Sequence, residues 1–187
     1  MIVGLLLAAG ESRRFGSRKL LYPLADGTLI GVRSAENLKR GLDRVVAVVS
    51  PTDSDLVSRF AALDIEICPC NRSREGMGAS FACGVRAAPD ADGWVIALAD
   101  MPSIQPATIA AIAQAIRDGA PIAAPVHAGQ RGHPVGFARE YYAELAALGG
   151  DEGARVLLAR DRTRVKLIPV DDPGIHQDID TPEDLAG

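Results

Sequence analysis

Short apolar runs alternate with amphipathic segments along the chain. Runs such as Ile2–Leu7 and Trp94–Leu98 are apolar at nearly every position, which is the pattern of strands buried on both faces. Strands are predicted at Ile2–Leu7, Val45–Val49, Ile65–Cys68, Trp94–Leu98, Ile122–Pro125 and Val165–Val170. Helices are predicted at Leu29–Arg40, Asp53–Leu63, Ala79–Ala87, Pro106–Asp118, Arg139–Leu148 and Gly153–Arg160. This alternation predicts an α/β fold with a mostly parallel central sheet covered by helices, in which ligands bind at the carboxyl ends of the strands.

Local signals support some of these boundaries. Asp53 and Thr181 are expected N-caps, and Pro106 and Pro182 suit the first turn of a helix, where their missing N–H groups would have no partner. The chain has 187 residues, of which 48% are hydrophobic, and this is enough to form a buried core. We find no repeat, low-complexity run or linker, and therefore expect one domain over residues 1–187.

The charge of the chain limits its partners. A net charge of −4 is unlike the basic footprint of a nucleic-acid binder, and the cations are concentrated in one loop near the N-terminus. A small anionic substrate is therefore expected, and no nucleic acid. The apolar run from Ile2 to Ala9 has no charged segment before it and is too short to cross a bilayer, so we expect a cytoplasmic protein without a membrane partner.

Three cysteines are present, Cys68, Cys70 and Cys83. Their number is odd, and the Cys-Pro-Cys sequence lacks the Cys-x-x-Cys spacing of zinc and redox motifs. Because cysteine is among the residues most often buried, we expect all three to be reduced thiols with a structural role.

The loop after the first predicted strand carries the main candidate chemistry. Gly10 and Gly16 allow backbone conformations that expose N–H groups. The same segment contains four cations, Arg13, Arg14, Arg18 and Lys19. Exposed amides and clustered positive charge together indicate a site for a polyphosphate.

Two better-known phosphate loops are excluded. A Walker A loop requires Gly-Lys-Ser/Thr in succession, whereas Lys19 lies three residues after Gly16 and is followed by Leu20. The dinucleotide fingerprint requires a Gly-x-Gly pair, whereas Gly4, Gly10 and Gly16 are six residues apart. The missing fingerprint argues against a nicotinamide-dependent dehydrogenase.

Later motifs each have two interpretations. Asp100 follows a predicted buried strand and is either a ligand at its carboxyl end or an ordinary turn residue. The Glu75–Ser80 loop either binds a nucleotide or simply joins a strand to a helix. His133 is either a structural hydrogen-bonding residue or a ligand. Asp151 is either an N-cap or a ligand, and Arg155 either pairs with a phosphate or is simply exposed.

The first loop resembles the signature of the molybdopterin nucleotidyltransferases, Leu-Ala-Ala-Gly-x-Ser-x-Arg-x-Gly-x-x-Lys. The matching residues are Leu7, Ala8, Ala9, Gly10, Ser12, Arg13, Gly16 and Lys19, with Phe15 where the family usually has Met. The double alanine is more similar to the cytidylyl branch than to the guanylyl branch, which usually reads Ala-Gly-Gly. The resemblance implies a Rossmann-like three-layer α/β/α sandwich of the nucleotide-diphospho-sugar transferase type.

The resemblance also implies roles for individual residues. Lys19 and Arg13 would balance the phosphate charge during catalysis. Nucleotide binding would fall to Leu7, Ala8, Ala9, Gly10, Gly16, Lys19, Gly76 and Ser80. Asp100, in an Ala-Asp-Met-Pro element, would be catalytic and would bind Mg²⁺, with Asp178 as the second metal ligand and Asp180 as the alternative to Asp178.

Two further motifs resemble acceptor-binding elements of the same family. His133 lies in a Gly-His-Pro motif, and Asp151 and Arg155 lie in a Gly-Asp-x-Gly-Ala-Arg motif. These three residues are the implied contacts to the phosphorylated acceptor.

The implied reaction transfers CMP from CTP to molybdopterin and releases pyrophosphate, with Mg²⁺ as cofactor. An acceptor phosphate is already an anion, so its attack on the α-phosphorus needs no general base, and catalysis depends on positioning and charge neutralisation. A molybdoenzyme or its chaperone is a further candidate partner. The alternatives are transfer of GMP to molybdopterin, transfer of a nucleotide to a sugar phosphate, and a noncatalytic nucleotide-binding partner of a molybdoenzyme.

Overall fold

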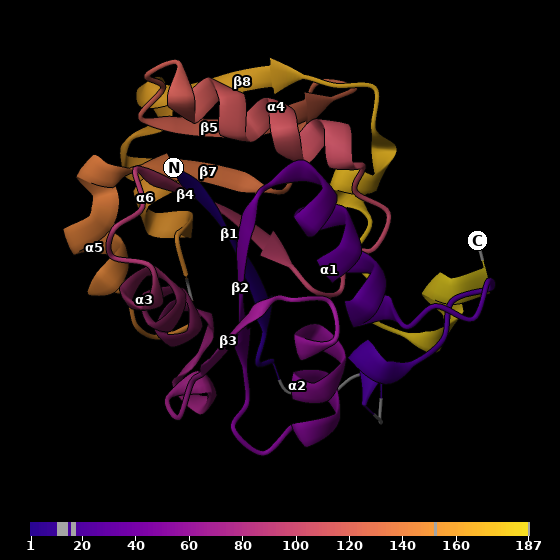
Figure 1. Cartoon of the computed structure of the whole chain (residues 1–187). Coiled ribbons are helices and arrows are strands. Elements are labelled where there is room, and N and C mark those ends of the chain that lie inside the picture. The colour runs from indigo at the N-terminus through magenta and orange to yellow at the C-terminus, as the bar shows by residue number, and fades with distance from the viewer. Residues whose placement is uncertain (11–14, 16–17, 152, 187) are drawn as a thin grey trace.

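The structure is a computed structural model, and within the residues it describes (1–10, 15, 18–151 and 153–186) eight strands form one sheet (Figure 1). The strands are β1 (Ile2–Ala8), β2 (Arg44–Val49), β3 (Glu66–Pro69), β4 (Gly93–Leu98), β5 (Ile122–His127), β6 (Gln130–Arg131), β7 (Val135–Ala138) and β8 (Val165–Pro169). Their order is β3-β2-β1-β4-β7-β5-β6, and β8 pairs with β5. The pairs around β1 are parallel, whereas β7 runs antiparallel to β4 and β5, so the sheet is mostly parallel as predicted.

Helices cover the sheet, and their bounds are close to the predicted ones. They are α1 (Ile30–Gly41), α2 (Ser54–Ala61), α3 (Met77–Ala87), α4 (Pro106–Arg117), α5 (Tyr142–Ala146) and α6 (Arg155–Arg160). Short 3₁₀ helices join them: η1 (Lys19–Leu21), η2 (Ser73–Glu75), η3 (Arg139–Tyr141), η4 (Arg162–Arg164), η5 (Pro173–His176) and η6 (Pro182–Ala186). The Asp53 carboxylate caps α2 by accepting from the N–H of Leu56 at 3.3 Å, as predicted.

Some elements differ from prediction. The strands β6 and β7 were not predicted, because β6 has only two residues, both polar, and β7 follows directly after a glycine-rich segment and a proline. The helix predicted over Arg139–Leu148 is the short η3 followed by α5. After Thr181 the chain forms η6 instead of an α-helix. The N-cap of α6 is Ala154, so the capping interpretation of Asp151 is wrong.

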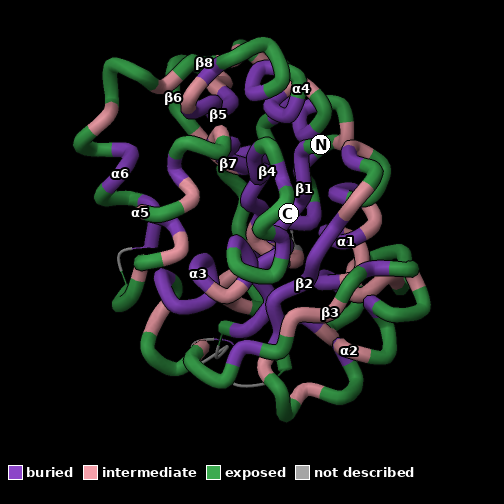
Figure 2. The backbone as a smooth tube through the Cα atoms, turned by 60° about the vertical axis from the view of Figure 1, so that its left-hand side comes forward, coloured by how far each residue is buried: buried purple, intermediate pink, exposed green. Residues whose placement is uncertain are grey.

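Two apolar cores lie on opposite faces of the sheet. Alternate residues of β1 point to opposite faces, with Ile2 and Leu6 in the core beneath α1, α2 and α4, and Val3 and Leu5 in the core beneath α3, α5 and α6. The strand β1 is therefore buried along its whole length (Figure 2). Two helical layers around one sheet confirm the predicted α/β/α sandwich.

The cysteine prediction was wrong for two of the three residues. Cys70 and Cys83 form a disulfide with their Cα atoms 6.0 Å apart, and Cys68 is free. The spacing rules that we applied concern neighbouring cysteines, whereas this pair joins the end of β3 to α3 across thirteen positions of sequence.

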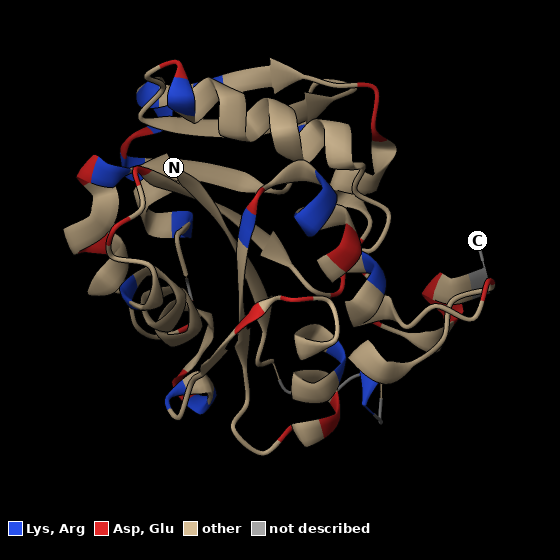
Figure 3. Ribbon diagram, in the orientation of Figure 1, with Lys and Arg blue, Asp and Glu red and all other residues tan. Residues whose placement is uncertain are grey.

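The side on which successive strands are added to the sheet changes at β1. From β1 the chain builds β2 and β3 on one side and then returns to form β4 on the other side of β1. In α/β sheets the crevice beyond the carboxyl ends of two such strands is the usual ligand site. Charged residues lie mainly on the helices and loops around the sheet (Figure 3). In the described part of the chain, no helix is both long enough and apolar enough to traverse a membrane.

Candidate functional site

Asp100 lies at the carboxyl end of β4, in the crevice beside β1. Two polar side chains of α1 hold the turn around it: the Ser34 hydroxyl donates to the carbonyl of Ala99 at 2.8 Å, and the Asn37 amide donates to the carbonyl of Pro102 at 3.0 Å. Both side chains are buried. Hydrogen bonds on either side of Asp100 therefore fix its position relative to α1.

Lys19 reaches the same crevice from η1. Its residue is only 8% exposed, and its Nζ donates to Asp100 Oδ2 at 2.8 Å and to Asp180 Oδ1 at 3.4 Å. These contacts join positions far apart in the chain, and the C-terminal segment accordingly lies beside the part of the chain that contains η1 (Figure 1). A buried charge needs such partners, since its desolvation would otherwise be very costly.

The C-terminal arm, residues 171–186, crosses the end of the sheet, and two of its anchors lie at Asp100 and at the start of α4. The N–H of Ile179 donates to the carbonyl of Asp100 at 2.9 Å. Earlier in the arm, the buried Asp172 accepts from the Gln105 N–H at 2.9 Å, the Thr108 hydroxyl at 2.6 Å and the Gly174 N–H at 3.0 Å. The anchors bring the residues on either side of Ile179, Asp178 and Asp180, to Asp100.

A cavity of about 500 Å³ opens beside Asp100, between the ends of β1 and β4 and the start of α3. It is lined by Leu7, Ala9, Gly10, Ser73, Arg74, Gly76, Met77, Ser80, Leu98, Asp100 and Asp151. Most of the predicted nucleotide-binding residues therefore share one cavity. Ala8 does not line it, because alternate residues of a strand face opposite sides and Ala8 belongs to the core beneath α1, α2 and α4.

Glycines at the start of α3 allow a second loop to approach this cavity. The N–H of Gly78 donates to the carbonyl of Gly150 at 2.8 Å, and a Cβ atom at Gly78 would lie 2.4 Å from the Gly149 carbonyl oxygen. Gly76 has a φ of +113°, and a Cβ there would lie 2.5 Å from Asp151 Oδ1. These glycines therefore place Asp151 at the edge of the cavity.

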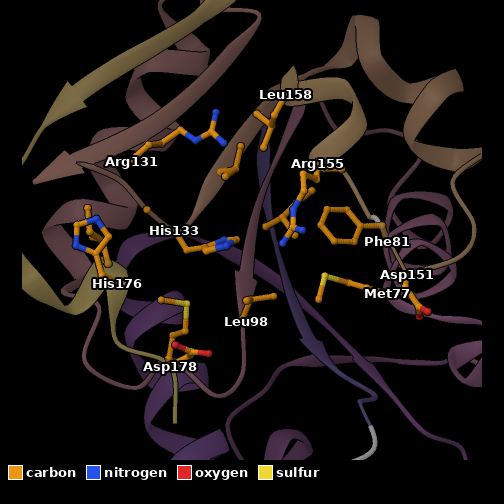
Figure 4. A pocket seen from close by; sticks show the side chains of 16 residues that line it. Met77, Phe81, Leu98, Arg131, His133, Asp151, Arg155, Leu158, His176 and Asp178 are labelled. Carbon is orange, nitrogen blue, oxygen red and sulfur yellow. The ribbon is translucent and has the colours of Figure 1, made fainter. Parts of the chain in front are cut away.

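A second cavity, of about 460 Å³, lies next to the first and shares Met77, Leu98 and Asp151 with it (Figure 4). One part of its lining is apolar: Met77, Phe81, Ile96, Leu98, Met101, Val135, Ala154, Leu158 and Ile175. The other part is polar: Arg131, Gly132, His133, Asp151, Arg155, His176 and Asp178. All three predicted acceptor-binding residues, His133, Asp151 and Arg155, therefore line this cavity.

His133 has a distinct electrostatic environment. Its Nδ1 is buried and has no hydrogen-bond partner among the described residues, while its backbone N–H donates to the carbonyl of Ile175 at 3.0 Å. Burial is the main cause that lowers the pKa of the imidazole, and the carboxylates of Asp100 and Asp178 oppose this effect. The ring of His133 borders the second cavity, and a neutral imidazole has one nitrogen that donates and one that accepts.

The candidate metal ligands fit a cation that arrives with phosphates. Asp100 borders the first cavity and Asp178 the second, while Asp180 contacts Lys19. Over the described part of the chain, no group of three or more His, Cys, Asp or Glu side chains is close enough to hold a metal. Mg²⁺ in phosphoryl-transfer sites is commonly bound by one or two carboxylates, with substrate phosphates and water as the other ligands. The predicted site residues Arg13 and Gly16 lie outside the described residues.

The sequence interpretation missed Ser34, Asn37 and Asp172. Each is buried and fixes the backbone near the site. The first two had a detectable signal, because they interrupt the helix face that otherwise carries Ile30 and Leu38. Asp172 had none, since an Asp next to a proline and another Asp is typical of an exposed turn.

Comparison with known proteins agrees with this geometry. Residues 4–165 match the model of the MobA-like NTP transferase domain. The chain belongs to this family. The purine catabolism protein PucB of Bacillus subtilis is 30% identical, over 98% of this chain and 93% of that protein. Nicotine blue oxidoreductase of Paenarthrobacter nicotinovorans is 28% identical, over 98% of this chain and 94% of that protein.

Solved structures extend the comparison. Rv0371c from Mycobacterium tuberculosis is 29% identical and has a TM-score of 0.85, covering 99% of this chain and 95% of that chain. A structure of Rv0371c in complex with manganese has a TM-score of 0.79, at 28% identity over 99% and 96% of the two chains. A nucleotidyl transferase from Methanothermobacter, 21% identical, has a TM-score of 0.84 over 100% of this chain and 94% of that chain, and this likeness shows the fold.

Proposed function

We propose that the protein transfers CMP from CTP to molybdopterin, with Mg²⁺ and with release of pyrophosphate. The observation that carries this proposal is the pair of adjacent cavities at the ends of β1 and β4. One has the lining expected for a nucleotide and the other the lining expected for an acceptor. Leu98, two residues before Asp100, borders both cavities, so the reacting groups of two substrates would meet near Asp100.

In this proposal a phosphate oxygen of the acceptor attacks the α-phosphorus of CTP. The new P–O bond forms as the bond between the α-phosphorus and its bridging oxygen breaks, and pyrophosphate leaves with that electron pair. Lys19 and Arg13 neutralise phosphate charge, and Asp100 and Asp178 would hold Mg²⁺, which stabilises the charge of the leaving group. In the second cavity, Arg155 and His133 orient the acceptor.

The choice of base and acceptor rests on particular residues. Ser80 is buried in α3 and borders the first cavity, where it would contact the cytosine, and the Ala8-Ala9 sequence resembles the cytidylyl branch. The apolar part of the second cavity, with Phe81 and Leu158, suits a flat heterocycle, and Arg131 and Arg155 suit its phosphate. A molybdoenzyme or its chaperone would then receive the product.

Pyrophosphate release from CTP, GTP, ATP and UTP, each with Mg²⁺ and with or without molybdopterin, tests the proposal. We expect release from CTP alone and only with molybdopterin. Asp100→Ala should lose at least about 100-fold in rate, because it lacks a carboxylate that would hold Mg²⁺, the ion that would stabilise the negative charge of the transition state. The matched control is Asp43→Ala, which removes an exposed carboxylate away from both cavities and should act like the native protein. Release from GTP would assign the protein to the guanylyl branch.

The relative named nicotine blue oxidoreductase makes reduction of a flat aromatic compound the second candidate function. The apolar lining of the second cavity would accept such a compound. The missing dinucleotide fingerprint argues against this candidate, which predicts consumption of NADH or NADPH in the presence of an aromatic quinone or imine and no release of pyrophosphate from any triphosphate. The two assays therefore separate the candidates.

A further inference from the structure

We propose that Lys19 occupies the cation position at Asp100 until a nucleoside triphosphate binds, so that the divalent cation and the nucleotide bind together and neither binds well alone. This inference rests on the proposed function, because it takes Asp100 as a metal ligand and Lys19 as a phosphate ligand. It adds that binding of the metal at Asp100 and binding of the triphosphate at Lys19 depend on each other.

The contacts of Lys19 indicate that it opposes the binding of a divalent cation at Asp100 in the absence of a nucleotide. The Lys19 ammonium lies 2.8 Å from Asp100 Oδ2 and 3.4 Å from Asp180 Oδ1, so both carboxylates already have a positive partner. The Lys19 side chain is 9% exposed, whereas the Asp100 side chain is 25% exposed. A divalent cation approaching Asp100 from the cavity would therefore meet the buried ammonium within a few ångströms, where two positive charges repel each other strongly.

The burial of Lys19 explains why a triphosphate would help the metal to bind. If a metal displaced the ammonium from Asp100, the lysine would keep only its longer contact, with Asp180, in a place where water reaches it poorly, and a buried charge that loses its nearer partner is unfavourable. A triphosphate removes this penalty, because its oxygens offer Lys19 a new anionic partner as the metal takes Asp100. The metal in turn offsets the repulsion between the phosphates and Asp100. Such coupling is reciprocal, since each ligand must raise the affinity for the other by the same factor.

The experiment measures binding of Mn²⁺ alone, by the electron paramagnetic resonance signal of the free ion, without nucleotide and without turnover. We expect weak binding to the native protein and at least about 10-fold tighter binding to Lys19→Met, within the range of measured couplings between sites. Adding Asp100→Ala to Lys19→Met should abolish the gain, which assigns the bound ion to this carboxylate. Lys39→Met, which removes an exposed ammonium on α1 that contacts neither Asp100 nor Asp180, should bind Mn²⁺ as the native protein does.

Circular dichroism first establishes that Lys19→Met is folded, and Lys19→Gln provides the same comparison if the methionine variant does not fold. Equal Mn²⁺ affinity in the native protein and a folded Lys19 variant would overturn the inference, as would a gain that survives Asp100→Ala. The outcome is independent of the proposed reaction. A gain in Mn²⁺ affinity in a protein that releases no pyrophosphate would support this inference and contradict the proposed function, and normal pyrophosphate release without the gain would do the reverse.

Discussion

At the scale of single residues, buried polar side chains hold the backbone around the site in position. Ser34, Asn37 and Asp172 all hydrogen-bond to the backbone or to another side chain, whereas the Nδ1 atom of His133 has no such partner among the described residues. An unpaired buried nitrogen usually costs about 1–3 kcal/mol of stability. Among the described residues, the Nδ1 atom of His133 is therefore a cost to stability that no hydrogen bond offsets.

The pH dependence of stability tests the environment of His133. Because burial lowers the pKa of the folded imidazole below its ordinary value of about 6.5, the unfolded chain takes up a proton at His133 before the folded chain does. Stability should therefore fall as the pH drops below about 6.5, by at most about 1.4 kcal/mol for this group at pH 5.5. Urea unfolding at pH 7.5 and 5.5 should show a smaller loss for His133→Gln than for the native protein. Equal losses would show that the His133 pKa is not lowered.

At the scale of elements, the start of α3 depends on close contact with the loop of residues 149–151. Gly78→Ala would place a Cβ atom 2.4 Å from the Gly149 carbonyl oxygen, and backbone must move to relieve this clash. We expect a loss of about 1–3 kcal/mol in the free energy of unfolding, typical of overpacking, together with weaker binding of CTP, because Gly76 and Asp151 would shift. Thermal denaturation and calorimetric titration measure the two effects. The matched control is Gly149→Ala, since a Cβ there has open space; a loss of equal size in the control would contradict the packing argument.

The disulfide between Cys70 and Cys83 closes the loop that contains η2 and the start of α3. A crosslink over a loop of this length typically stabilises by about 2–4 kcal/mol, so reduction should lower the free energy of unfolding by this amount. Urea unfolding with and without dithiothreitol measures the difference. Cys68→Ala should retain the effect of the reductant, and Cys83→Ala should abolish it. Native protein that titrates with three free thiols before reduction would contradict the pairing.

The sequence predicted those features that depend on local pattern. The strands β1 and β4 were predictable because both of their faces are apolar, and α2 because Asp53 caps it. The ion pair of Lys19 with Asp100 was not, because 81 positions separate the two residues and only the order of β1 and β4 in the sheet brings them together. The same holds for the disulfide, which depends on how α3 lies against β3.

At the scale of the whole molecule, the site is completed by the last segment of the chain. The C-terminal arm contributes Asp178 and Asp180 to a crevice that β1 and β4 form, and α4 holds the arm through Thr108. Two of the three hydrogen bonds of Asp172, from Gln105 and Thr108, connect the arm to the start of α4, and the third, from Gly174, lies within the arm. Asp172 lines neither of the two cavities, and disturbing this anchor should change the site more than the fold of the sheet.

Asp172→Asn tests this connection. Asparagine offers one acceptor oxygen where the carboxylate offers two, so at least one donor loses its partner, and hydrogen bonds to a charged group contribute about 1.5–3 kcal/mol each. We expect a loss of about 2–3 kcal/mol in stability and faster hydrogen exchange in residues 173–180, with exchange in β1 and β4 unchanged, and a weaker response of CTP binding to Mn²⁺. Asp171→Asn is the control, because the carboxylate of Asp171 is exposed and takes no part in the hydrogen bonds of Asp172. If Asp172→Asn left exchange in the arm as slow as in Asp171→Asn, the arm would be held by its other contacts, among them those of Ile179 with Asp100 and of Ile175 with His133, and the site would be independent of α4.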